Sequence, residues 1–108
     1  MYQYRKVYTL DFTNVVHYLE IHFVIRQALD FPDYYGCNWD AFGDCLTNMV
    51  GRPIHMEIIG FDIIEHKFEN AAKIMMETLK DFKHYENDEY VNDIQIEIVR
   101  GNTRTVLQ

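Results

Sequence analysis

The sequence predicts a small α/β fold in which a three-stranded parallel sheet is flanked by three to four helices. Three segments rich in β-branched and aromatic residues, 6–12, 54–59 and 93–99, are typical of strands. The segments between them show helical periodicity, and helical crossovers between strands favour parallel pairing. The length of 108 residues fits one domain, 1–108. A chain of this size buries roughly two-thirds of its unfolded surface, enough for a core without disulfides or metal.

The first strand leads directly into a predicted helix. Residues 6–12, KVYTLDF, form the strand, and Thr13 is a suitable N-cap for a helix from Asn14 to about Leu29. The apolar stripe of this helix is broad, which predicts that more than one neighbouring element covers it.

A loop and a second helix follow. Segment 30–37, DFPDYYGC, contains a proline and a glycine and therefore predicts a loop. Asn38 is a good N-cap for a helix that runs to about Val50, because a glycine and a proline stand just beyond that residue and stop it.

The second half of the chain begins with the strand at 54–59 and a connection that holds a short helix near 62–65. A strong amphipathic helix is predicted over 68–84. Its apolar stripe consists of Phe68, Ala71, Ala72, Met75, Leu79 and Phe82. Segment 93–99 alternates between apolar and polar residues, so one of its faces is buried and the other is wet. The tail, 100–108, either frays or adds a short edge strand.

The charge of the chain restricts its partners. Its net charge is −7, and its pI is near 5.0. Nucleic acid is not expected to be a direct partner, because phosphates repel such a protein. A cationic protein partner fits, since opposite fields speed encounter. Many cytosolic proteins are acidic for solubility alone, so the charge by itself does not decide between these interpretations.

The sequence also indicates a compartment. Cys37 and Cys45 are too few for a secreted disulfide framework. The first residues, MYQYRKVYTL, lack the apolar core of a signal peptide. No apolar run approaches the roughly 20 residues of a membrane span, so no membrane partner is expected. We therefore expect a cytoplasmic protein with reduced thiols.

The second helix carries the strongest functional pattern. Asp40 and Asp44 are neighbours one turn apart on its polar face, where like charges destabilise a helix by a few tenths of a kcal/mol. Gly43 in mid-helix costs roughly 0.5–1 kcal/mol relative to alanine. A helix with both features is not optimised for stability alone, which indicates a docking surface. Two other interpretations remain: a merely solvated acidic face, and a glycine that allows close helix–helix packing.

Residues 31–50, FPDYYGCNWDAFGDCLTNMV, closely resemble the signature segment of the barstar family, intracellular inhibitors of the secreted bacterial ribonuclease barnase. The residues that match in the same spacing are Pro32, Tyr34, Tyr35, Gly36, Asn38, Asp40, Asp44, Cys45 and Leu46. A weaker similarity continues over 69–83. The resemblance implies the family fold, three parallel strands flanked by helices, and a protein that blocks a ribonuclease active site with its loop and second helix.

The resemblance also implies roles for single residues. Asp44 would be the main anchor, because its carboxylate would replace a substrate phosphate against the cationic side chains of the enzyme. Asp40 would support it from one turn earlier. Tyr34 would pack near the catalytic histidine of the enzyme.

Further contacts are implied around these three. Asn38 and Gly36 would offer polar and backbone contacts, and Thr47 would reach the rim along the same helix face. On the last long helix, Asp81 stands where the family has an acidic contact residue. The set of partner-binding residues implied in this way is Tyr34, Gly36, Asn38, Asp40, Gly43, Asp44, Thr47 and Asp81.

The chain departs from the family pattern at several of these positions. Barstar has a tryptophan where this chain has Gly43, and another where it has Met49. Asn48 replaces a glycine, and Trp39 replaces a leucine. Because the first change removes a large contact aromatic, the departures bear on the identity of the target more than on the mode of binding.

Three functions compete. The first is inhibition of a basic ribonuclease. The second is an enzyme that uses Asp40 and Asp44 as an acid–base pair or a metal site; the sequence opposes it, because it offers no nucleophile with a paired base and no phosphate loop. The third is an immunity or antitoxin protein for a different nuclease or toxin. The sequence predicts no enzyme activity, no cofactor and no metal site.

Other residues carry structural expectations. The five histidines, His17, His22, His55, His66 and His84, are expected at the surface or its boundary, since no two stand at i, i+4 on one helix. Cys45 is expected to be a buried small hydrophobe. Tyr35 is expected to point inward and Tyr34 outward.

Overall fold

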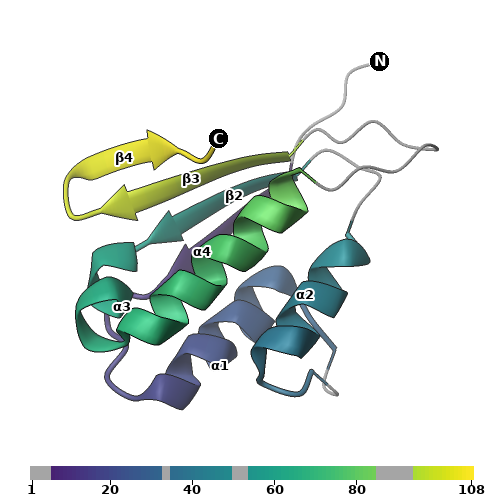
Figure 1. The fold of residues 1–108 in the computed structure, drawn as a ribbon, viewed down its shortest axis with the longest axis horizontal. Helices are drawn as coiled ribbons and strands as arrows, with labels where there is room; N and C mark the ends of the chain where they lie inside the picture. Colours follow the sequence, from purple (N-terminus) through teal and green to yellow (C-terminus); the bar gives the residue numbers. More distant parts are fainter. Residues whose placement is uncertain (1–5, 33–34, 50–53, 85–93) are drawn as a thin grey trace.

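A four-stranded sheet in the order β1-β2-β3-β4 forms one layer of the protein, as the computed structural model shows (Figure 1). The structure describes residues 6–32, 35–49, 54–84 and 94–108. The elements are, in chain order, β1 (Lys6–Asp11), α1 (Tyr18–Leu29), α2 (Trp39–Thr47), β2 (Ile54–Ile59), α3 (Phe61–Lys67), α4 (Glu69–Lys83), β3 (Ile94–Arg100) and β4 (Thr103–Val106).

The first three strands are parallel, as predicted from their helical connections. Alternate residues of β2 and β3 are buried, which is the signature of a sheet covered on one face. The buried strand residues are Leu10, Ile54, Met56, Ile58, Ile94, Ile96 and Ile98. The three-stranded parallel sheet of the sequence analysis is therefore confirmed.

The sheet has a fourth strand beyond the three predicted parallel ones. β4 pairs antiparallel with β3, so the tail forms the edge strand that was one of its two predicted states. Leu107 donates its backbone N–H to the Ile96 carbonyl at 2.8 Å and is buried. Across the open face of the sheet, Arg104 donates to the carboxylates of Glu57 and Glu97 at 2.6 and 2.9 Å.

The start of α1 differs from the prediction. Thr13 does not cap this helix, because its hydroxyl and backbone N–H bind the Asp11 carboxylate instead. The helix begins at Tyr18, after the N-cap His17. Glu20 accepts the backbone N–H groups of Val16 and His17 at 2.8 and 2.6 Å, which satisfies donors that the first helical turn leaves unpaired.

The helices bury their apolar faces as predicted. In α4, the stripe from Ala71 to Phe82 is buried, while Phe68, just before the helix, is half-buried against the core. α2 and α4 lie side by side and contact each other (Figure 1). None of the helices in the described part of the chain has the length and apolarity to cross a membrane.

Candidate partner-binding surface

Tyr35 anchors the loop before α2 to the body of the protein. Its side chain is 5% exposed, and its backbone N–H donates to the Pro32 carbonyl at 2.9 Å. Its hydroxyl lies 2.7 Å from Nδ1 of His22 on α1. The inward orientation predicted for Tyr35 is confirmed, whereas Tyr34 lies outside the described residues and its role stays a prediction.

His22 lies in the interior, so the expectation that the histidines lie at the surface or its boundary is wrong for this residue. Its side chain is fully buried, and burial lowers its pKa. The rings of Tyr35 and Trp39 lie 5.8 and 4.5 Å from its ring. The sequence did hold a signal: His22 precedes buried Ile25 by three residues, so it lies on the apolar stripe of α1.

Asn38 organises both the loop and the start of α2. Its Oδ1 accepts the Ala41 backbone N–H at 2.8 Å, which confirms the predicted N-cap. Its Nδ2 donates to the Gly36 carbonyl at 3.2 Å. A side chain at Gly36 would require this amide to shift, because a Cβ there would lie 2.9 Å from Nδ2. The Asn38 side chain thus links two predicted contact residues, Gly36 and Asn38 itself.

Trp39 joins the first turn of α2 to α1. Its indole N–H donates to the Tyr18 hydroxyl at 2.7 Å, and the residue is half-buried against the core. Trp39 therefore lies nearer the core than the exposed face of α2. The contact fixes the orientation of α2 around its own axis.

The opposite face of α2 carries the two carboxylates. Asp40 and Asp44 are both exposed, one turn apart, with Asp40 in the first helical turn. Within the described ranges, neither carboxylate takes part in a hydrogen bond or an ion pair. The Thr47 hydroxyl donates to the Asp44 carbonyl at 2.7 Å, so this predicted contact residue is held against the same helix.

A groove between α2 and α4 brings Asp81 to the same surface. Its volume is about 220 Å³, and Gly43, Asp44, Thr47 and Asp81 line it from the two helices. Four residues predicted to bind a partner are therefore neighbours in space. Three further residues line the groove that the sequence analysis did not assign to partner binding: Leu46, Thr78 and Phe82.

The structure argues against one interpretation of Gly43, that glycine is needed there for close helix–helix packing. A Cβ at this position would meet Thr78 Cγ2 at 3.8 Å, an ordinary van der Waals distance. Close helix–helix packing therefore does not require glycine here. The missing side chain leaves the groove open, which is the feature that a docking surface would use.

Cys45 differs in degree from its expected burial. It lies on the inner side of α2 but is half-buried rather than fully buried. Burial, and secondarily the charge of Asp44, raise the pKa of its thiol. Cys45 therefore behaves as an inert apolar residue at the edge of the core.

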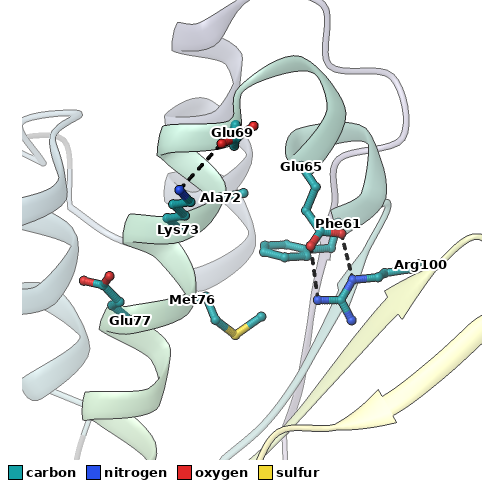
Figure 2. A pocket seen from close by; sticks show the side chains of 8 residues that line it. All are labelled: Phe61, Glu65, Glu69, Ala72, Lys73, Met76, Glu77 and Arg100. Carbon is teal, nitrogen blue, oxygen red and sulfur yellow. Dashed lines mark hydrogen bonds and ion pairs between the residues drawn. The ribbon is translucent and has the colours of Figure 1, made fainter.

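A second hollow, of about 340 Å³, opens between α3, α4 and the end of β3 (Figure 2). Four of its five charged groups are paired: Arg100 donates to Glu65 at 2.7 and 3.3 Å, and Lys73 lies 3.6 Å from Glu69. The fifth, Glu77, has no partner among the described residues. Although this hollow is larger, both of its cations and two of its three carboxylates already have partners. The α2 surface, whose two carboxylates have no partner among the described residues, is the better candidate for binding a charged protein.

Comparisons with known proteins match this region of the chain. The sequence model of the barstar family, described as barstar (barnase inhibitor), matches residues 5–97. A Bacillus subtilis (strain 168) protein named "Putative ribonuclease inhibitor YrdF" is 32% identical over 80 residues, which are 74% of this chain and 85% of that protein. The family match includes the loop, α2 and α4, and it ends before β4.

Proposed function

The chain belongs to the barstar family, and from this premise we propose that it inhibits a basic ribonuclease. The segment that would enter the active site is the loop up to Asn38 together with the outer face of α2. The proposal assigns the chain no chemistry of its own, because the surface acts by occupying the site of another protein.

The observation that carries the proposal is the pair of exposed carboxylates on a helix that is anchored at its N-terminal end. Asp40 and Asp44 lie one turn apart on α2, which carries no lysine or arginine. A ribonuclease active site is cationic because it binds a phosphate. Carboxylates placed against such a site form charge-assisted hydrogen bonds, bidentate where the partner is arginine.

The scaffold behind this helix supports the proposal. The Asn38 cap, the contact between Tyr35 and His22, and the bond from Trp39 to Tyr18 attach Tyr35 and the start of α2 to the body of the protein. Such preorganisation lowers the entropy lost on binding, so more of the contact energy remains as affinity.

We assign Asp44 as the main anchor. Asp44→Ala should weaken inhibition of a barnase-type ribonuclease by at least about 30-fold, because it leaves a buried cationic group of the enzyme unpaired. The free energy of unfolding should change by no more than about 0.5 kcal/mol, as is usual for an exposed residue. Inhibition constants and urea melts of both proteins measure the two effects.

The matched control is Glu77→Ala, which removes the same charge from an exposed position of α4 beside the second hollow. It should inhibit like the unmodified protein. Asp40→Ala should cause a smaller loss than Asp44→Ala. Equal losses from all three variants would show that net charge alone matters and would refute the anchor.

The open groove at Gly43 favours one other candidate within the same mode of binding. An immunity or antitoxin protein for a different basic nuclease or toxin would use the same carboxylates with a differently shaped surface. If the unmodified protein does not inhibit a barnase-type ribonuclease, a panel of basic nucleases and toxins distinguishes this candidate.

A further inference from the structure

We propose that the groove between α2 and α4 receives one arginine or lysine side chain of the target protein and thereby selects which target this chain inhibits. The inference rests on the proposed function. It extends that function from the exposed carboxylates to a pocket formed by Gly43 and Thr78 on facing helices.

The size of the groove suits a side chain. Pockets for small molecules usually measure roughly 300–1,000 Å³. The groove, at about 220 Å³, is smaller than this range. Energetically important interface residues commonly insert one large side chain into a pocket of the partner. A single protruding residue of the target therefore fits better than a separate ligand.

The lining of the groove specifies the chemistry of that side chain. Leu46 and Phe82 are buried and provide an apolar floor. Asp44 and Asp81 are the charged residues of the lining, and both are acidic. Arginine and lysine combine an aliphatic stem with a cationic end, so the stem contacts the apolar floor while the charge meets the carboxylates.

The second hollow differs from the α2–α4 groove in the partners of its carboxylates. There, the carboxylates of Glu65 and Glu69 already lie beside Arg100 and Lys73 of the same chain (Figure 2). In the α2–α4 groove, by comparison, no lysine or arginine of the described residues pairs with either lining carboxylate. A cation from another protein would complete this site.

The first experiment fills the groove from opposite walls. Thr78→Leu adds apolar bulk from α4, and Gly43→Leu adds it from α2. Each should weaken inhibition by about tenfold or more. Asn70→Leu, at an exposed position near the other end of α4, is the matched control and should retain full inhibition.

Thr78 is the decisive position because it lies at the groove but is not among the predicted contact residues. If Gly43→Leu weakens inhibition while Thr78→Leu does not, Gly43 lies on a flat contact surface and the groove is empty in the complex. That outcome overturns the inference and leaves the proposed function intact. Thermal melts verify that each variant is folded.

The second experiment tests the groove without any nuclease. N-acetyl-arginine amide is titrated into the unmodified protein and followed by amide NMR shifts, with the neutral N-acetyl-citrulline amide as control. We expect saturable shifts at Gly43, Thr47 and Thr78 with the arginine compound, and weaker ones with citrulline. Equal responses to the two compounds, or shifts away from the groove, would overturn the inference. Groove binding without inhibition of a barnase-type ribonuclease would support the groove and count against a barnase-type target, which the panel of basic nucleases and toxins would then replace.

Discussion

His22 couples the buried interior of α1 to the loop that precedes α2. It is fully buried, and Tyr35 is its hydrogen-bond partner through Nδ1, while Nε2 has no partner among the described residues. Because a charged imidazole would lose its hydration in this position, burial lowers the pKa of His22. Burial also raises the pKa of Tyr35, so the phenol stays neutral.

This burial predicts a loss of stability in mild acid. Below the ordinary histidine pKa of 6.5, the unfolded chain binds a proton that the native chain does not, so the free energy of unfolding falls as pH falls. The slope is at most about 1.4 kcal/mol per pH unit for one proton. Urea melts between pH 7.5 and 5 measure it.

His22→Gln should flatten this dependence, whatever its effect at neutral pH. His66→Gln, at an exposed position of α3, is the control and should keep the slope of the unmodified protein. The carboxyls of Asp11, Glu20 and Glu97 have lowered pKa values, so their contributions are lost only in stronger acid. An unchanged slope in His22→Gln would exclude this histidine as its source.

Asn38 offers a second prediction at the scale of one residue. Asn38→Ala removes the acceptor for the Ala41 backbone N–H and should lower the free energy of unfolding by about 1 kcal/mol. Asn48 stands at the other end of α2, where its backbone N–H rather than its side chain makes the cap bond, to the Leu46 carbonyl. Asn48→Ala should therefore cost less. Equal losses in urea melts would show that the cap contributes little.

Among the elements, β4 depends on a charged cluster across three strands. Glu57 and Glu97 face each other on neighbouring strands, where like charges repel, and Arg104 donates to both carboxylates. Arg104, and secondarily His55, lower the pKa of Glu97 by hydrogen bonding. We expect this cluster to favour pairing of the tail with the sheet over fraying.

Arg104→Gln should therefore loosen β4 and raise the pKa of Glu97 toward its ordinary value. Hydrogen exchange at the Leu107 backbone N–H, which donates to the Ile96 carbonyl, should accelerate. Lys80→Gln removes the same charge from an exposed position of α4 and should leave this exchange unchanged. Unchanged protection of Leu107 in Arg104→Gln would mean that backbone pairing alone holds the strand.

The helices show where local signals suffice and where they compete. The Asn38 cap and the stripe of α4 were predicted correctly, because capping and periodicity depend on residues within one or two turns. The predicted start of α1 was wrong because two residues could satisfy the start of a helix, Thr13 as an N-cap and Glu20 from within the first turn. The Asp11 carboxylate binds Thr13, and Glu20 closes the helix from inside its first turn.

For the whole molecule, the charge of −7 predicts steered association with a basic partner. Raising the ionic strength shortens the screening length from about 10 Å at 0.1 M to about 3 Å at 1 M. The association rate constant with a barnase-type ribonuclease should fall by about tenfold or more over this range. Stopped-flow mixing measures it, and the dissociation rate constant, which should change less, is the internal comparison. Association that is independent of salt would contradict steering.

The amino-acid sequence by itself determined the order of the elements and the acidic face of α2, because each depends on residues close together along the chain. It also predicted the parallel core of the sheet, because helical connections between strands favour parallel pairing. Tertiary structure decided the burial of His22, the pairing of β4 and the groove that joins Gly43 to Asp81. These features need contacts between distant segments, as between Arg104 and Glu57, 47 residues apart. Asp81 was predicted as a contact residue only from the family resemblance, and Thr78 was not predicted as one. The physical reason is that two helices line the groove, so its shape depends on how they pack against each other. The periodicity of either helix alone does not predict that packing.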